Sequence, residues 1–141
     1  MLNNKSISLN LLKKCLVIFG YSINPQTTLL TSTSPYIKLP IIYDTELVDK
    51  IRFLLSSTGT KFAAEDEDLK KDTGLTFNHI QAPGVRSIGI ESINQSLIFT
   101  PYKKVFRKGF SPIIEKTITL PIDASDTEIL IAIKGTLENS F

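Results

Sequence analysis

The amino-acid sequence predicts a single-domain α+β protein, in which an antiparallel sheet packs against helices that include a C-terminal helix. The chain has 141 residues, a length that suits one compact domain. Its second half holds three short runs of strand-forming residues, and its last segment combines a helix-capping motif with an apolar stripe. Neither an internal repeat nor a linker divides the sequence, so we treat residues 1–141 as one domain.

The composition, with 42% hydrophobic and 21% charged residues, is typical of a globular protein. A formal net charge of +2 is too small to indicate a nucleic-acid partner by itself. Cys15 is the only cysteine, so no internal disulfide can form. Asn10, Lys13 and Lys14 interrupt the apolar start, which we assign to the fold rather than to a signal peptide. No apolar run reaches the roughly 18 residues of a membrane span, so we expect a cytosolic protein without membrane contact.

The first predicted element is a short amphipathic helix over residues 9–19. Gly20 stands where a helix C-terminus favours a residue that tolerates a left-handed backbone. Val17 and Ile18 are β-branched, which leaves a strand as the alternative. The apolar residues that recur at helical spacing are Leu11, Leu12, Cys15, Leu16 and Phe19.

A polar connection and a second helix follow. Residues 22–35 are rich in Ser, Thr, Asn and Pro and are typical of a surface connection with room for one short strand. Tyr36–Tyr43 is predicted to be extended, and Pro40 favours a sheet edge. Asp44 then provides an N-cap for a helix that runs to about Ser56. The apolar face of this helix comprises Leu47, Val48, Ile51, Leu54 and Leu55.

The middle of the chain, residues 61–74, is polar and charged. It contains the consecutive acids Glu65, Asp66, Glu67 and Asp68. The pattern indicates either a short solvated helix or a long loop.

Strand signals dominate the second half. Residues 86–91, 96–100 and 116–120 each concentrate β-formers, and Ser92–Gln95 is short enough to be a hairpin loop. A final helix begins with a capping box formed by Ser125 and Glu128. We expect its apolar face to lie on the sheet; this face comprises Ile129, Ile133 and Leu137, with Ala132 and Ile131 at its margins.

No constellation of catalytic or metal-binding residues stands out. His79 is the only histidine and has no second ligand or partner at a suitable spacing, so we expect a structural role. Cys15 lies on an apolar face and is expected to be a small buried hydrophobe. Nucleophile elbow, phosphate-binding glycine loop and zinc spacing are all missing from the sequence. We therefore expect no enzyme activity, no cofactor and no metal.

Two charged runs remain as candidate binding surfaces. Consecutive acids point in different directions, so residues 65–68 make a poor catalytic pair and are either a solvated surface or a dock for a basic partner. In residues 102–112 the cations Lys103, Lys104, Arg107 and Lys108 alternate with aromatic residues. Three interpretations stay open for this basic run: an exposed hairpin that protects a sheet edge, a nucleic-acid contact, or a dock for an acidic protein.

Residues 86–141 resemble the immunity proteins of bacterial contact-dependent growth inhibition systems. The similar features, in order, are the strand pair RSIGIE and SLIFTPYKK, a GFSP-like turn at Gly109–Pro112, the strand ITLPIDAS, and a helix that opens with SDTEIL. The resemblance implies an α+β fold with an antiparallel sheet. It also implies a non-enzymatic protein that binds the toxic C-terminal domain of a secreted effector and keeps it inactive in the cytosol. Such toxins are commonly nucleases. The alternative is a small nucleic-acid-binding module that uses residues 103–108.

A nuclease holds phosphate through Lys and Arg, so an inhibitor that covers its active site is expected to present acids. We therefore predict that the toxin docks on Glu65, Asp66, Glu67 and Asp68, with Asp72 in support. The alternative docking residues are Lys103, Lys104, Arg107 and Lys108. Direct binding of nucleic acid is not expected under the toxin-docking prediction.

Overall fold

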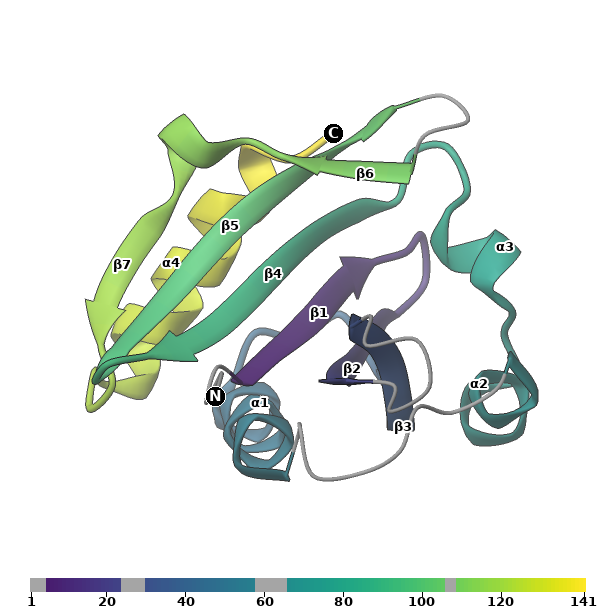
Figure 1. Ribbon diagram of the computed structural model, residues 1–141, viewed down its shortest axis with the longest axis horizontal. Coiled ribbons are helices and arrows are strands. Elements are labelled where there is room, and N and C mark those ends of the chain that lie inside the picture. Colours follow the sequence, from purple (N-terminus) through teal and green to yellow (C-terminus); the bar gives the residue numbers. More distant parts are fainter. Residues whose placement is uncertain (1–4, 24–29, 58–65, 106–108) are drawn as a thin grey trace.

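The computed structural model describes residues 5–23, 30–57, 66–105 and 109–141. Within these residues, seven strands form one antiparallel sheet in the order β3-β2-β1-β4-β5-β6, and β7 pairs with β5 beside β6 (Figure 1). The strands are β1 (Lys5–Leu11), β2 (Leu16–Ile23), β3 (Leu30–Leu39), β4 (Arg86–Ile93), β5 (Ser96–Val105), β6 (Gly109–Pro112) and β7 (Ile118–Pro121). The helices are α1 (Thr45–Ser57), α2 (Asp66–Thr73), α3 (Phe77–Ile80) and α4 (Asp126–Glu138), with a 3-10 turn, η1 (Ile114–Lys116), between β6 and β7. The predicted α+β class with a C-terminal helix is confirmed.

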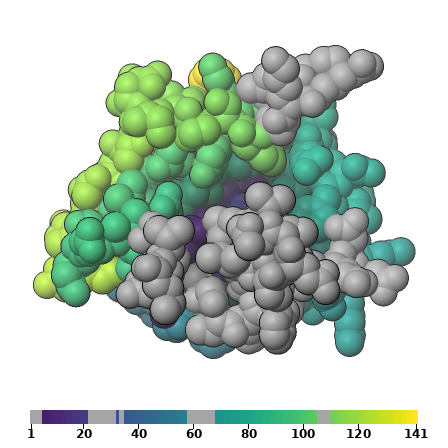
Figure 2. All heavy atoms as spheres, in the orientation of Figure 1, coloured from purple at the N-terminus to yellow at the C-terminus, as the bar shows by residue number. Residues whose placement is uncertain are grey.

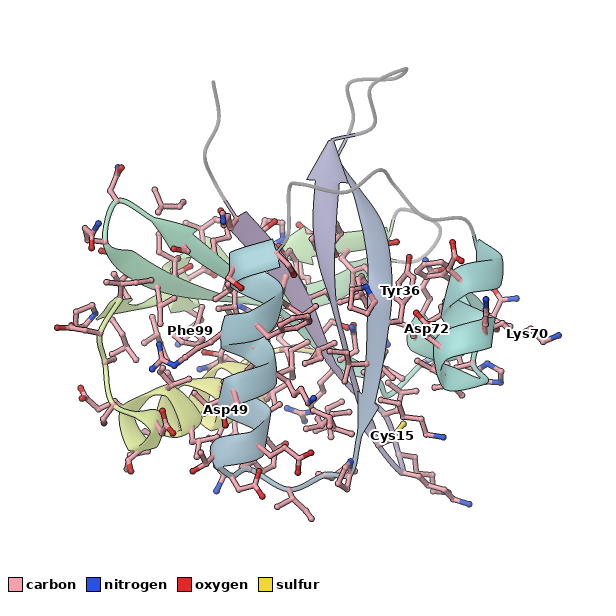
Figure 3. All side chains as sticks on the ribbon, turned by 90° about the horizontal axis from the view of Figure 1, so that it is seen from below. Cys15, Tyr36, Asp49, Lys70, Asp72 and Phe99 are labelled. Atoms are coloured by element: carbon pink, nitrogen blue, oxygen red, sulfur yellow. The ribbon has the colours of Figure 1, made fainter. Side chains whose placement is uncertain are left out.

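One face of the sheet carries the main core, because α1 and α4 pack against it (Figure 1). Alternate residues of the strands point into this core, as the period of two in a strand requires. Phe99 of β5 is fully buried there and lies on the same side of the sheet as both helices (Figure 3). Strand residues of this core that are completely buried include Ile7, Leu9, Leu16, Ile18, Ile88 and Ile90.

The opposite face of the sheet is only partly covered. Near β2 and β3, Leu69 of α2 and Ile80 of α3 complete a second, smaller core. Phe19 and Tyr36 contribute their rings to it, with centroids 5.2 Å apart. Figure 3 shows α2 on the other side of β2 and β3 from α1. Among the residues that the structure describes, no helix covers the part of this face over β1, β4 and β5.

The predicted helix over residues 9–19 is wrong, because this segment forms the end of β1, a turn and most of β2. Lys13 and Lys14 are exposed at the turn, where the Leu12 N–H donates to the Cys15 carbonyl over 2.9 Å. The apolar residues of β2 are continuous because that strand is buried on both faces, and a short continuous run does not distinguish a helix from a strand. Gly20 lies inside β2 next to a register shift.

Several other predictions for the first half are confirmed. The Asp44 carboxylate accepts a hydrogen bond from the Leu47 N–H over 3.3 Å at the start of α1. The buried residues of α1 are the five predicted ones, Leu47, Val48, Ile51, Leu54 and Leu55. Strand β3 is an edge strand, as Pro40 led us to expect, but its bounds differ from the prediction. It begins at Leu30, inside the predicted connection of residues 22–35, and it ends at Leu39 rather than at Tyr43. Between the two alternatives for the acidic middle, residues 66–73 form a helix.

The strand hairpin of the second half is confirmed, with a tighter loop than residues 92–95. Asn94 and Gln95 alone make the turn between β4 and β5, and both have positive φ angles, 47° and 68°. Two successive residues with positive φ match the twist of a hairpin. The GFSP segment, Gly109–Pro112, is not a turn but strand β6, because it pairs with residues 102–105 of β5. The strand predicted over 116–120 begins two residues later, since Lys116 belongs to η1.

Helix α4 begins as predicted. The Ser125 hydroxyl accepts from the Glu128 N–H over 3.2 Å, and the Glu128 carboxylate accepts from the Ser125 N–H over 3.2 Å. Ile129, Ile133 and Leu137 are buried on the sheet together with Ala132. Ile131 was expected at the margin of this face, but it is 66% exposed and points away from the sheet.

Candidate binding groove

A small groove opens on the partly covered face of the sheet. Figure 2 shows the purple atoms of β1 at the bottom of a hollow beside the green atoms of β5 and β6. Its volume is about 220 Å³. The groove, as we use the name below, is lined by Ser8, Asn10, Phe19, Tyr21, Ser32, Phe77, Ile80, Gln81, Ser87, Tyr102 and Phe110.

The floor of the groove consists of small polar residues on the two central strands. Ser8 and Asn10 of β1 alternate with Ile7 and Leu9 of the main core, and Ser87 of β4 pairs with Asn10 across the strands. The Asn10 amide donates to the Ser8 hydroxyl over 3.0 Å and to the Val17 carbonyl over 3.2 Å. The Ser87 hydroxyl donates to the Asn10 side-chain oxygen over 2.6 Å. This network satisfies the buried amide and holds the floor in one arrangement.

Tyr102 of β5 lies across Gly89 of β4. A Cβ atom at position 89 would stand 2.9 Å from the Tyr102 hydroxyl oxygen and 3.0 Å from Cε2 of its ring. Any larger residue would therefore have to displace the ring, so the absence of a side chain at Gly89 permits the position of Tyr102. Two partners hold the backbone of Tyr102: strand β6 pairs with it, and the Phe141 N–H near the end of the sequence donates to the Tyr102 carbonyl over 3.0 Å.

The electrostatics of the groove favour neutral tyrosines. Burial, with smaller contributions from Tyr21 and Glu91, raises the pKa of Tyr102 to about 12. Burial also raises the pKa of Tyr21, which is hydrogen-bonded to Ser8. In the described part of the chain the Tyr102 hydroxyl has no hydrogen-bond partner. A neutral phenol that is mostly buried and unpaired can donate to a bound acceptor.

Aromatic rings form the walls. Phe110 of β6 meets Tyr102 edge to face at one side of the groove, with ring centroids 6.3 Å apart and an interplanar angle of 68°. Phe19 and Phe77, which also line the groove, form a second edge-to-face pair, at 6.3 Å and 87°. Such pairs keep ring edges and faces at preferred angles and leave surfaces that a further ring can contact.

The predicted acidic docking residues lie on or before α2, at the margin of the same sheet face. Glu65 lies outside the described residues, as do the side chains of Asp66 and Glu67 in the first turn. Asp68 is half-buried, and Asp72 is exposed. The Asp72 carboxylate accepts a hydrogen bond from the Tyr36 N–H over 3.0 Å, and the two residues stand next to each other in Figure 3. Asp72 therefore joins α2 to the edge strand β3, a structural role that the sequence did not indicate.

The described cations of the basic run do not share one face. Lys103 and Lys104 are consecutive residues of β5, so their side chains point to opposite sides of the sheet. The Lys104 ammonium donates to the Ala82 carbonyl in the loop after α3, and burial lowers its pKa. Arg107 and Lys108 lie outside the described residues.

The residues considered for chemistry have local partners. His79 Nδ1 accepts a hydrogen bond from the Thr76 N–H over 3.0 Å at the start of α3. Cys15 is buried in the second core, as predicted for a small hydrophobe. In the described ranges no group of three or more His, Cys, Asp and Glu residues could hold a metal ion. Among the same residues, no helix is both long and apolar enough to cross a membrane.

The groove residues were missed because the first strand was assigned to another element. In Ser6-Ile7-Ser8-Leu9-Asn10, polar and apolar residues alternate strictly, which indicates a half-buried strand with a polar outer face. The run from Ser87 to Glu91 alternates in the same way, with Gly89 on the polar face. The two patterns together were the available signal for a polar strip across adjacent strands.

Neither a protein-family model nor a curated protein sequence matches the chain. Two solved structures share its fold over nearly the whole length. One is a protein of unknown function from Neisseria meningitidis, with a TM-score of 0.76, 17% sequence identity, and coverage of 99% of this chain and 96% of the other. The second is a chain of a CdiA-CT/CdiI toxin and immunity complex from Yersinia pseudotuberculosis, with a TM-score of 0.72, 13% identity, and coverage of 99% of each chain. The fold found here is thus one that occurs in a toxin and immunity complex.

Proposed function

We propose that the chain is a cytosolic, non-enzymatic immunity protein that binds the toxin domain of a contact-dependent growth inhibition effector and keeps it inactive. The observation that carries the proposal is the similarity in fold, over 99% of the chain, to a chain of a toxin and immunity complex. The resemblance of residues 86–141 to immunity proteins supports the immunity side of such a pair. If the chain is the immunity protein of such a pair, a toxin domain should be encoded immediately upstream, and it should bind the purified protein at an equimolar ratio.

The partner we propose is a nuclease toxin, and the proposed docking surface is the sheet face that carries α2 and the groove. Leu69 of α2 packs in the same small core as Phe19 and Phe77, which line the groove. Helix α2 therefore lies on the same sheet face as the groove. Acidic side chains at such a margin would attract the Lys and Arg residues with which a nuclease holds phosphate.

Charge reversal on two helices tests this surface. The variant Glu67→Lys, Asp68→Lys is expected to associate with the toxin about tenfold more slowly at low salt and to lose protection of cells that express the toxin. Its matched control is Glu46→Lys, Asp49→Lys on α1, which lies on the opposite side of the sheet (Figure 3). Asp72 is left unchanged because it holds Tyr36.

The basic run is tested in parallel. Lys103→Glu is preferred to a change at Lys104, which contacts the Ala82 carbonyl. Association rates by surface plasmon resonance and survival of toxin-expressing cells are measured for each variant. Normal protection by the α2 variant together with failure of Lys103→Glu would reverse the docking assignment and place an acidic surface on the toxin.

A further inference from the structure

The groove has the size of one large side chain. Liquid water occupies about 30 Å³ per molecule, so 220 Å³ corresponds to roughly seven waters. A single projecting side chain of a protein partner fits a space of this size.

The lining excludes a charged occupant. None of the groove residues carries a formal charge at neutral pH, because the lining contains no Lys, Arg, His, Asp or Glu and its tyrosines are neutral there. A cationic or anionic side chain placed there would lose its hydration without gaining an opposite charge. Charge complementarity therefore selects a neutral residue.

The hydrogen-bonding atoms of the groove that are still available favour an occupant that can both accept and donate a hydrogen bond. The Asn10 amide hydrogens are used by Ser8 and Val17, and the Ser87 hydroxyl hydrogen is used by Asn10. The Tyr102 hydroxyl can still donate, and the Ser87 oxygen can still accept. An occupant without polar atoms would leave the Tyr102 hydroxyl desolvated and unpaired, which is unfavourable.

We propose that the groove receives a tyrosine side chain of the partner toxin, whose ring packs against the aromatic lining at Phe110 and Phe77 and whose hydroxyl reaches Tyr102 and Ser87. The two edge-to-face pairs of the walls provide aromatic surfaces for the ring, and the polar floor provides partners for the hydroxyl. Tyrosine is also among the residues that dominate binding energy in protein interfaces. This inference rests on the proposed function for the identity of the partner.

The first test uses p-cresol, which is the side chain of tyrosine as a free molecule. Titration into the ¹⁵N-labelled full-length protein is followed by two-dimensional NMR. Amide signals of β1, β4 and β5 next to the groove are expected to shift and saturate. Tyr102→Phe should weaken the affinity for p-cresol about two- to tenfold, because the hydrogen bond to the Tyr102 hydroxyl is lost. Phe110→Ala should also weaken this affinity, because an aromatic surface that contacts the ring is removed.

Phe53→Ala provides the matched control, because Phe53 is an exposed phenylalanine of α1 on the opposite side of the sheet, 51% exposed. It should leave p-cresol affinity unchanged. Signals that shift only around the larger cavity beside α1 and the β4–β5 hairpin, of about 560 Å³, would overturn the proposal. Equal affinity of wild type, Tyr102→Phe and Phe110→Ala for p-cresol would also overturn the proposal.

The second test uses the toxin domain encoded next to this chain. Tyr102→Phe and Phe110→Ala are expected to speed dissociation of the complex, the latter about tenfold, whereas Phe53→Ala does not. If toxin binds all four proteins with one dissociation rate, the groove assignment fails and the proposed function stands. If the toxin binds none of the four proteins, the proposed function is wrong, and so is the assignment of the occupant to a toxin tyrosine. The p-cresol titration then decides by itself whether the groove binds a phenol ring.

Discussion

At the scale of single residues, Asp72 connects two elements that are far apart in the sequence. Its carboxylate accepts the Tyr36 N–H of edge strand β3 over 3.0 Å. We predict that Asp72→Ala lowers the free energy of unfolding by about 1–2 kcal/mol, because a partly buried N–H loses a charged acceptor. Asp72→Asn keeps a side-chain oxygen and should cost less. Urea denaturation of the three proteins provides the measurement, and equal stabilities would show that α2 is held by packing alone.

Tyr102 gives the protein a dependence on alkaline pH. A tyrosine of the unfolded chain ionises near pH 10.0, whereas folded Tyr102 keeps its proton to about pH 12. The stability that the neutral phenol contributes is therefore fully present below pH 10 and is lost as pH rises through 12. Tyr102→Phe has no proton to lose at this site, so it should lose less stability than wild type between pH 9 and pH 11. The free energy of unfolding of both proteins is measured by urea denaturation at the two pH values. An equal loss in wild type and Tyr102→Phe would contradict the raised pKa of Tyr102.

Residue roles were predictable where the partner is close in sequence. The caps at Asp44 and Ser125 follow from spacings of three residues, and both were predicted correctly. Asp72 and Gly89 could not be assigned in this way. Their partners, Tyr36 and Tyr102, are brought to them only by the pairing of strands and the position of α2.

At the scale of elements, α4 separates a buried from an exposed isoleucine within one turn. Ile133 is completely buried against the sheet, and Ile131 is 66% exposed. Ile133→Ala is expected to lower the free energy of unfolding by about 2–5 kcal/mol, because it leaves a cavity in the core. Ile131→Ala, the same chemical change on the same helix, should stay within about 0.5 kcal/mol of wild type. A small effect of Ile133→Ala in thermal or urea denaturation would place this face of α4 outside the core.

Elements were predicted well where one face alone is buried and poorly where both are. Helix α1 buries one stripe, and its five core residues follow directly from the helical period. Strand β2 is covered by the main core on one side and by the second core on the other. Its apolar residues therefore fit a helical and a strand pattern equally, and only pairing with β1 and β3 decides between them.

At the scale of the whole molecule, the sheet divides the protein into two unlike faces. One is closed by α1 and α4, and the other carries α2, α3 and the groove (Figure 1). The sequence predicted the class and the closed face, because amphipathic helices must cover apolar strand residues. It could not predict the open face, since the residues of the groove come from seven separate segments of the chain. A surface of this kind is defined by topology, and its binding properties follow from the arrangement rather than from any local motif.

The two faces also bear on the choice between a protein partner and direct nucleic-acid binding. Lys103 and Lys104 lie on opposite sides of the sheet, and Lys104 contacts the Ala82 carbonyl, so the described cations of the basic run offer no continuous track for a phosphate backbone. We predict that the purified protein binds RNA weakly at 50 mM salt and not measurably at 200 mM, while the toxin complex persists at both. Fluorescence anisotropy with a labelled RNA measures the first interaction, and the same titration with the toxin domain measures the second. A protein that makes several phosphate contacts loses affinity by orders of magnitude over this salt range. Tight RNA binding with such a salt slope, abolished by Lys103→Glu, would show that the basic run is a nucleic-acid site and would replace the immunity function proposed above.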